Sequence, residues 1–144
     1  MGEREQMART LDLIGAIPLF ASLDERQLKM IAKIAQEKSF TAAATIVRQG
    51  EKGIGLYLIL EGEASVEKAG TKVATLRPGQ FFGEMALIAE EPRTADVRAL
   101  GPMRCLLMSR WEFWGAMADQ PEVIRALLVE TVKRLRAPGS GLTE

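Results

Sequence analysis

The chain of 144 residues contains no histidine, a single cysteine and as many acidic as basic side chains. Histidine is the commonest general base of enzymes and the commonest transition-metal ligand of proteins, so its absence disfavours most metal-dependent and acid–base chemistry. The sequence shows no serine nucleophile or other catalytic constellation in its place. We therefore expect a protein that is not an enzyme, with no catalytic residues, no metal site and no cofactor.

The other scarcities restrict where the protein works and what it binds. Cys105 cannot form a disulfide within the chain, and its apolar neighbours favour a buried small side chain over a reactive thiol. A formal net charge of zero gives no general attraction to nucleic acid or to an anionic membrane. No apolar run is long enough to span a bilayer, and the first residues lack the basic and apolar regions of a signal peptide. We expect a cytoplasmic protein that neither binds nucleic acid nor inserts into a membrane.

Hydrophobic residues make up 47% of the sequence, which is enough for the core of one soluble domain. From residue 39 to residue 109 short extended runs alternate with glycines, a pattern typical of an antiparallel β-roll or jelly-roll barrel. Helical patterns precede this segment over about residues 8–37 and follow it over about residues 110–136. We expect a mainly β fold with flanking helices, a single domain over residues 1–137 and a flexible tail over residues 138–144.

Local signals refine this outline. Pro18 interrupts the first helical pattern, and Pro121 opens the last helix. A helix cap is expected at Ser22 or Asp24, and Glu25, three positions after Ser22, is typical of a capping box. The residues of the β segment that we expect to face inward include Ala64, Val66, Val73 and Val97.

The main functional signal lies between residues 82 and 97. Alternate side chains of an extended segment share a face, so Arg93 lies on the side of the small apolar residues Ala95 and Val97. An arginine at the mouth of a core keeps its charge and needs an anionic partner, and its planar fork of donors suits phosphate. Asp96 lies on the opposite face, where we expect a solvated carboxylate with little effect on a pocket.

A second part of the signal precedes this arginine. Gly83 is followed by Glu84, Met85 and Ala86, which read as a single helical turn entered through glycine, where the backbone can approach a ligand closely. Unpaired amides at such a turn attract anions, whereas the carboxylate of Glu84 is suited to accept a hydrogen bond from a sugar hydroxyl. An arginine for phosphate and a glutamate for sugar suggest a nucleotide. The structural alternative is an ion pair between Arg93 and Glu84 or Glu90.

The block of residues 82–97 resembles the phosphate-binding cassette of the cyclic nucleotide-binding domain family. The resemblance covers about residues 12–136 and includes the glycine-punctuated segments 57–62 and 77–81. It implies that Glu84 holds the ribose 2′-hydroxyl, that Arg93 holds the cyclic phosphate, and that the backbone amides of residues 83–86 complete the cradle. Val66 and Ala74 are candidate pocket walls.

The same resemblance gives the last helix a function. In the family, a mobile C-terminal helix closes over the base, and nucleotide binding becomes a conformational signal. The candidate base contacts on this helix are Leu127, Leu128, Thr131 and Arg134, although core packing or a dimer contact would use the same leucine pattern. We expect the signal to pass to an unidentified effector protein or to act through self-association of this helix.

Ligand identity is only partly set by the sequence. The resemblance suggests that a hydroxyl beside the arginine, here Thr94, supports guanine recognition, whereas many adenine-selective members carry alanine or serine there. We favour cyclic AMP, with cyclic GMP as the competitor. The spacing from the cassette to Pro121 and Arg134 is similar to that in the binding domains of prokaryotic nucleotide-gated potassium channels, so both a channel fragment and a stand-alone sensor fit. The alternative function is a degenerate β-roll that binds no nucleotide and serves as a protein-interaction module.

Overall fold

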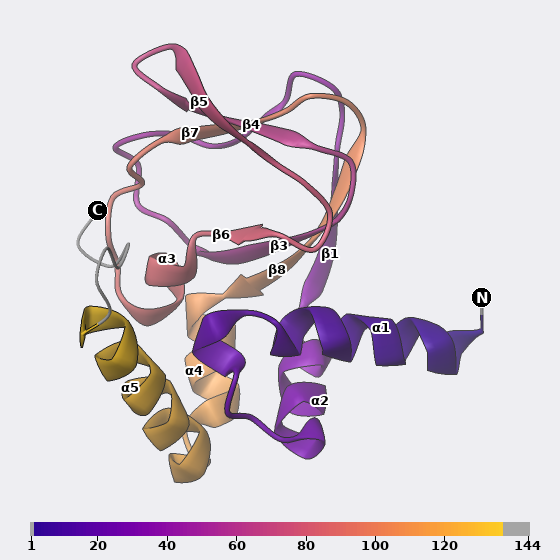
Figure 1. Ribbon diagram of the computed structural model, residues 1–144, viewed down its shortest axis with the longest axis vertical. Helices are drawn as coiled ribbons and strands as arrows, with labels where there is room; N and C mark the ends of the chain where they lie inside the picture. The colour runs from indigo at the N-terminus through magenta and orange to yellow at the C-terminus, as the bar shows by residue number, and fades with distance from the viewer. Residues whose placement is uncertain (1, 137–144) are drawn as a thin grey trace. The chain divides into compact units, whose positions relative to one another are not determined.

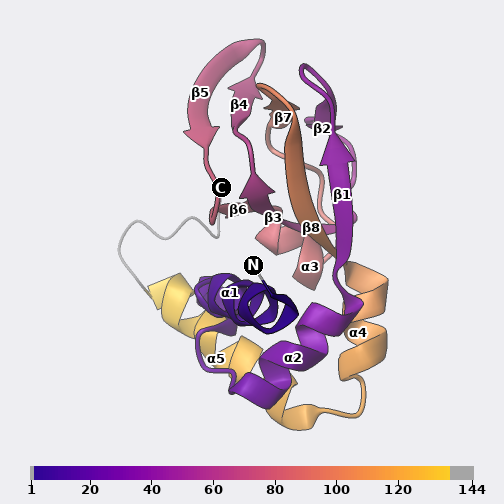
Figure 2. The same ribbon diagram turned by 90° about the vertical axis from the view of Figure 1, so that its right-hand side faces the viewer.

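A computed structural model describes residues 2–136 of the chain, with the side chain of Arg134 left out. This part of the chain forms two compact units. Residues 35–110 make a β-rich unit, and the segments on either side of it make a helical unit. Figures 1 and 2 show the elements of both. Each unit is described by itself, and the single domain expected over residues 1–137 stays a prediction.

The β-rich unit consists of two antiparallel four-stranded sheets, which Figure 2 shows in side view. The first sheet has the order β1 (Gln36–Phe40), β8 (Met103–Ser109), β3 (Gly55–Glu61) and β6 (Phe81–Phe82). The second has the order β2 (Thr45–Val47), β7 (Asp96–Ala99), β4 (Ala64–Lys68) and β5 (Thr71–Leu76). One short helix, α3 (Glu84–Ile88), follows β6 and packs beside β3. The expected β-roll with flanking helices is confirmed.

Side chains from both sheets meet in one hydrophobic cluster. The first sheet contributes Tyr57, Ile59, Met103, Cys105 and Leu107, and the second contributes Ala64, Val97 and Ala99. Burial of Cys105 is confirmed, and burial raises the pKa of its thiol to about 11. Of the residues expected to face inward, Ala64 and Val97 are buried and Val66 is partly buried against the cluster. Val73 is the exception, with 54% of its surface exposed, because it lies on the edge strand β5, which pairs with β4 alone.

The helical unit contains elements from both ends of the chain. They are α1 (Glu3–Gly15), a single 3-10 turn η1 (Pro18–Phe20), α2 (Glu25–Ile34), α4 (Arg110–Met117) and α5 (Pro121–Arg136). As expected, the first helical pattern is interrupted near Pro18: α1 ends at Gly15, and Pro18 opens η1. Pro121 opens the last helix, also as expected. The first helix begins earlier than the pattern indicated, and the first strand begins at Gln36 rather than at residue 39. No described helix combines the length and the apolar character needed to cross a membrane.

The start of α2 confirms Asp24, one of the two expected caps, and corrects the expected capping box. The Gln27 amide donates to Asp24 Oδ1 at 2.8 Å, and the Asp24 amide donates to Gln27 Oε1 at 3.0 Å. The capping box therefore joins Asp24 and Gln27 rather than Ser22 and Glu25, because the helix begins at Glu25 and makes Asp24 its N-cap. Ser22 instead donates its hydroxyl to Glu130 Oε1 of α5 at 2.6 Å.

Candidate functional site

Helix α3 is entered through a glycine, as the sequence predicted. Gly83 has a φ of 83°, a left-handed conformation that disfavours any side chain, and its carbonyl accepts the Ala86 amide at 3.0 Å. The side chains of Glu84 and Ala86 are buried, whereas that of Met85 is 39% exposed. The turn therefore holds Glu84 at a fixed place next to β3.

Arg93 lies between the end of α3 and β7, and its backbone is fixed on both sides. Its amide donates to the Glu51 carbonyl, and its own carbonyl accepts the Gly50 amide, both at 2.8 Å. The side chain reaches β3, where Nη2 donates to the Gly55 carbonyl at 2.7 Å. Nε is buried and has no acceptor among residues 2–136. Burial lowers the pKa of this guanidinium, so the structure keeps a cation in a desolvated position with little compensation.

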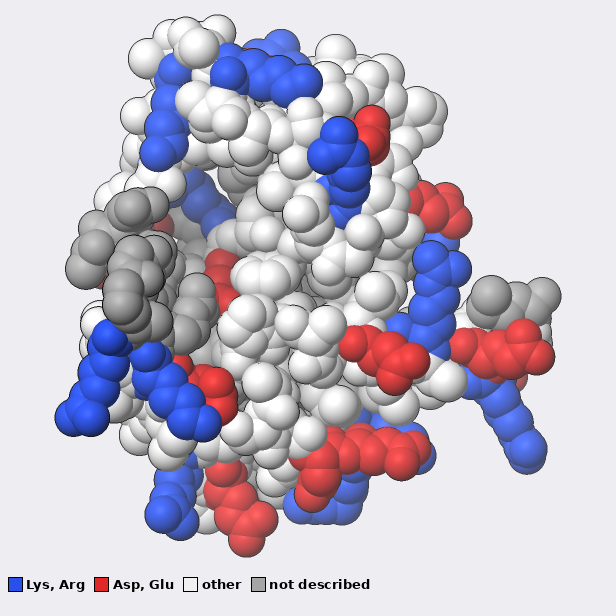
Figure 3. Space-filling model, viewed as in Figure 1, with Lys and Arg blue, Asp and Glu red and all other residues white. Residues whose placement is uncertain are grey.

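The ion pair that would have made Arg93 a structural residue is not formed within the described residues. Glu90, one of the two proposed partners, pairs with Lys52 at 3.4 Å, and the described carboxylates include none that pairs with Arg93. Other basic residues of the β-rich unit do pair with carboxylates: Arg48, Lys52, Arg77, Arg98 and Arg104. Figure 3 shows acidic and basic side chains interspersed over the visible face. Arg93 differs from these surface residues in burial and in pairing.

Two glycines leave the space that the Arg93 side chain occupies. A β-carbon on Gly53 would lie 2.6 Å from Arg93 Nε and 2.7 Å from Ala86 Cβ. One on Gly83 would overlap Nη1 and lie 2.7 Å from Nη2. The sequence indicated a close backbone approach at Gly83 but gave no sign of it at Gly53, whose contacts come from residues more than thirty positions away in the chain.

Tyr57 was also missed as a neighbour of the site. Its ring stacks on that of Phe82, with centroids 4.9 Å apart and planes 9° from parallel. Burial raises the pKa of the Tyr57 hydroxyl, and the nearby charge of Arg93 opposes part of that rise. An aromatic wall therefore stands beside the guanidinium, and a strand pattern of apolar residues could not distinguish this position from ordinary core.

Hydrogen bonds join the segment before β3 to the segment that carries Arg93. The Gly53 amide donates to the Glu91 carbonyl at 3.2 Å, and the Gln49 amide donates to Asp96 Oδ1 at 2.6 Å. Asp96 lies on the face opposite the core, as the alternation predicted, and the sequence did not indicate its bond to the loop that contains Gln49. Ala95, Val97 and Ala99 are all buried, which confirms that alternation.

Arg110 is a further residue that the sequence marked only as the start of a helix. Its Nη1 donates to the Gly53 carbonyl at 3.0 Å and to the Ala86 carbonyl at 3.1 Å. These partners lie 57 and 24 residues away in the chain, so no local pattern could have indicated them.

The remaining candidates of the β-rich unit lie at its surface or edge. Thr94 is exposed next to Arg93. Val66 pairs across the strands with Ala74 on one side and with Val97 on the other, so the three share one face of the second sheet. Ala74 is exposed on the edge strand, and Val66 is partly buried. The described residues include no group of three or more acidic or cysteine side chains placed to hold a metal.

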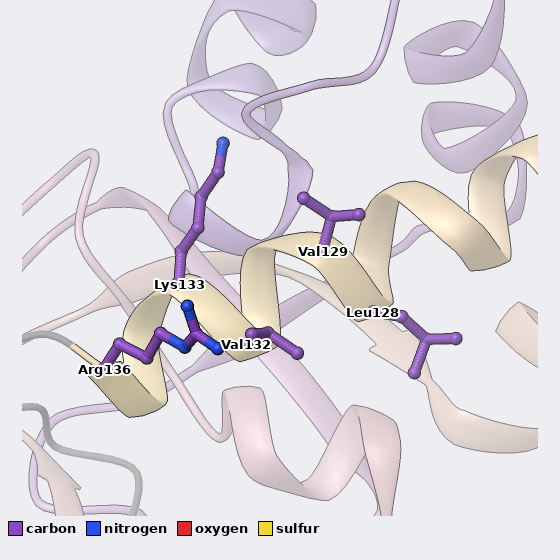
Figure 4. Close-up of a pocket in the computed structure, with 5 residues that line it drawn as sticks. All are labelled: Leu128, Val129, Val132, Lys133 and Arg136. Carbon is purple, nitrogen blue, oxygen red and sulfur yellow. The ribbon is translucent and has the colours of Figure 1, made fainter.

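The predicted base contacts lie on α5, in the helical unit. Leu127 is buried, and Thr131 donates its hydroxyl to the Leu127 carbonyl at 2.8 Å, within the helix. Leu128 is 62% exposed, and the Arg134 side chain lies outside the described residues. Figure 4 shows a pocket of about 310 Å³ lined by Leu128, Val129, Val132, Lys133 and Arg136 of the same helix. The base contacts stay predictions. The exposed residues of α5 include four large apolar side chains: Leu128, Val129, Val132 and Leu135.

Comparison with known proteins identifies the family. The profile of the cyclic nucleotide-binding domain matches residues 37–120. The cyclic nucleotide-gated potassium channel mll3241 of Mesorhizobium japonicum is 34% identical over 95% of this chain, and the chain spans 38% of that channel. The cAMP-dependent protein kinase regulatory subunit of Schizosaccharomyces pombe is 43% identical over 60% of the chain and 21% of its own length. The N-terminal domain of a transcriptional regulator from Streptomyces coelicolor has a TM-score of 0.82 and 28% identity, covering 87% of this chain and 91% of that one.

Proposed function

Because this chain belongs to the cyclic nucleotide-binding domain family, we propose that its β-rich unit binds cyclic AMP or cyclic GMP and acts as a sensor. The observation that carries the proposal is the half-buried guanidinium of Arg93, whose buried Nε has no acceptor among the described residues. A cyclic phosphate is a diester with one negative charge, so it can pair with this cation without a counterion. Desolvated charge pairs of this kind contribute strongly when the geometry is preorganised, as it is here by Gly55 and the Gly50–Glu51 backbone.

The other contacts follow from the same placement. Glu84 lies on α3 and accepts the ribose 2′-hydroxyl. The amides of residues 83–86 complete the phosphate cradle, with the Ala86 amide shared with the Gly83 carbonyl. Val66 and Ala74 form the wall along the second sheet, where Ala74 is exposed and open to a ligand. Thr94 is exposed beside the arginine and bonds a guanine if cyclic GMP is the ligand. None of these roles requires catalysis or a cofactor.

Signalling is assigned to α5. Its exposed apolar residues gain a partner surface when a nucleotide base is present, through Leu128, Leu127, Thr131 and Arg134, and the helix closes. A ligand shifts such an equilibrium only by its differential affinity, so a hundredfold preference for the closed state supplies about 2.7 kcal/mol. The signal passes to an unidentified effector protein or acts through self-association of α5, and the domain works in the cytoplasm. The chain spans 38% of the matched channel, so the activity of a whole channel is not assigned to it.

Titration of the purified protein with cyclic AMP and cyclic GMP by calorimetry tests the proposal, with 5′-AMP as the control that lacks the cyclic diester. We expect saturable binding of at least one cyclic nucleotide and a rise in the unfolding temperature on adding it, since a ligand of the native state must stabilise that state. Absence of binding and of stabilisation at millimolar concentration would refute the sensor. The apolar face of α5 would then favour the protein-interaction module.

A further inference from the structure

Arg110 is the residue at which the chain leaves β8 and enters α4, and it donates three hydrogen bonds to backbone carbonyls of other segments. The guanidinium Nη1 donates to Gly53 and to Ala86, at 3.0 and 3.1 Å. The Arg110 amide donates to the Ile54 carbonyl at 2.8 Å. One residue therefore ties together the end of β8, the loop before β3 and helix α3.

Each of the two side-chain contacts leads to a different part of the proposed nucleotide site. Ala86 belongs to α3, the helix that carries Glu84, and its carbonyl is among the last of that helix, which lack donors within the helix and attract a cation. Gly53 packs directly against Arg93, where even a β-carbon would not fit. Glu84, the candidate for the sugar, and Arg93, the candidate for the phosphate, are thus placed by two segments that both accept hydrogen bonds from the Arg110 guanidinium.

We infer that Arg110 is a positioning residue of the nucleotide site, a role that rests on the proposed function. It does not touch the ligand; it holds α3 and the Gly53 loop in the arrangement in which Glu84 and Arg93 meet the same nucleotide. Arg110 and Arg93 therefore have different roles in the site. Arg110 directs both of its side-chain hydrogen bonds to protein carbonyls, whereas Arg93 has a single one and a buried Nε with no acceptor among the described residues.

The test compares Arg110→Met with Arg104→Met as the matched control. Arg104 also lies on β8, and its guanidinium also bonds two partners, but these are the exposed carboxylates of Glu37 and Glu61 on the neighbouring strands. Two measurements are made on each variant: amide hydrogen exchange without ligand, and affinity for cyclic AMP and cyclic GMP. Exchange at Ala89, whose amide bonds to Met85 within α3, reports on the helix, and exchange at Ile59 in β3 reports on the sheet.

In Arg110→Met we expect Ala89 to exchange roughly tenfold faster while Ile59 is unchanged, and nucleotide affinity to fall by about tenfold or more, since two bonds to a charged donor are lost. The control should change neither quantity by more than about twofold. The variant Arg110→Lys keeps the positive charge but loses the planar guanidinium, so we expect a loss of nucleotide affinity between those of wild type and Arg110→Met. If Arg110→Met does not fold, Arg110→Lys tests the positioning role in its place.

The outcomes separate this inference from the proposed function. Unchanged exchange in α3 would overturn the positioning role whatever the ligand does. Faster exchange in α3 with unaltered affinity would also overturn it, while leaving the sensor intact. If the wild-type protein binds neither nucleotide, the proposed function fails and the role of Arg110 in nucleotide binding fails with it, even if exchange shows that the residue holds α3.

Discussion

The two units of the protein differ in how fully their buried polar groups are hydrogen-bonded. In the helical unit, Gln27 and Asp24 bond each other reciprocally, and Glu130 accepts from Ser22 and Lys133. These groups are satisfied by the protein itself. In the β-rich unit, Arg93 is half-buried with one side-chain bond to a carbonyl, and its buried Nε has no acceptor among residues 2–136.

The exposed apolar surface is also distributed differently. The described part of α5 exposes Leu128, Val129, Val132 and Leu135 along a single helix. The exposed apolar residues of the β-rich unit are spread over several segments: Ile54, Val73, Met85, Ile88 and Leu100. The incompletely paired arginine of the β-rich unit and the exposed apolar residues of α5 suggest that the two units have different functions. Under the proposed function, the β-rich unit would bind the charged ligand, and the exposed face of α5 would supply the surface that changes partners. If this comparison holds, substitutions in the two units must separate affinity from stability.

The largest effect is expected for Arg93→Ala, which removes the cation of the phosphate site. Nucleotide binding should weaken by about 2–5 kcal/mol, the range for removing one member of a desolvated charge pair. The free energy of unfolding without ligand should change by less than about 1 kcal/mol, because an incompletely paired buried charge stabilises the fold little. Calorimetric titration and chemical denaturation measure the two quantities.

Arg98→Ala is the control for this substitution. Arg98 lies five positions along the chain on β7, is exposed, and pairs with Glu67 at 3.7 Å. Its loss should leave nucleotide affinity unchanged. Wild-type affinity in Arg93→Ala would show that the arginine is structural and would remove the contrast between the units.

The next effect concerns Gly83→Ala, compared with Gly70→Ala. Both glycines have left-handed backbones, with φ of 83° and 81°, so both substitutions should lower the free energy of unfolding by about 1–2 kcal/mol. A β-carbon at Gly83 would also overlap the Arg93 guanidinium, whereas one at Gly70 meets nothing within 4 Å. Only Gly83→Ala should weaken nucleotide binding as well, by about 1–3 kcal/mol. Equal affinities in the two variants would mean that the space around the guanidinium has no part in binding.

A smaller effect is expected for Glu84→Gln, which keeps an acceptor but removes its charge. Wild-type protein should prefer cyclic AMP over its 2′-deoxy analogue, and the variant should lose about 1 kcal/mol of that preference. Glu91→Gln makes the same change of charge on an exposed neighbour and should leave the preference unaltered. If wild type and Glu84→Gln discriminate ribose from deoxyribose equally, Glu84 does not contact the sugar.

Sequence predicted the parts of this comparison that depend on neighbours in the chain. The alternation of Arg93 with Ala95, Val97 and Ala99 has a period of two in any strand, and Gly83 followed by a helical turn is equally local. The contacts of Arg110 could not be predicted, because strand pairing brings its partners from 24 and 57 positions away.

Two polar contacts were missed for the same reason. Asp96 was expected to be solvated, and its carboxylate also accepts the Gln49 amide at 2.6 Å. The helix cap was expected at Ser22 or Asp24; Asp24 is the cap, and Ser22 bonds to Glu130 of the last helix. In both cases a polar side chain with an adequate local explanation had a distant partner, which only the tertiary structure supplies.

The smallest effect is in the helical unit and depends on pH. The hydrogen bond from Ser22 lowers the pKa of Glu130, with a lesser contribution from Lys133. A carboxyl group whose pKa is lower in the folded state stabilises that state at pH values above the ordinary pKa, which is near 4.5. This stabilisation is lost as the pH falls through the lowered pKa. In Ser22→Ala the pKa should return toward its ordinary value, and the free energy of unfolding should fall by at most about 1 kcal/mol at pH 7. Chemical denaturation at pH 7 and pH 3 should therefore show a larger difference in the free energy of unfolding between wild type and Ser22→Ala at pH 7.

The variant Lys133→Gln should show the same trend more weakly, since the Lys133 side chain is 66% exposed. Neither variant should change the affinity of the cassette for nucleotide. A difference of equal size at both pH values would mean that Ser22 stabilises the unit by packing rather than through the ionised carboxylate.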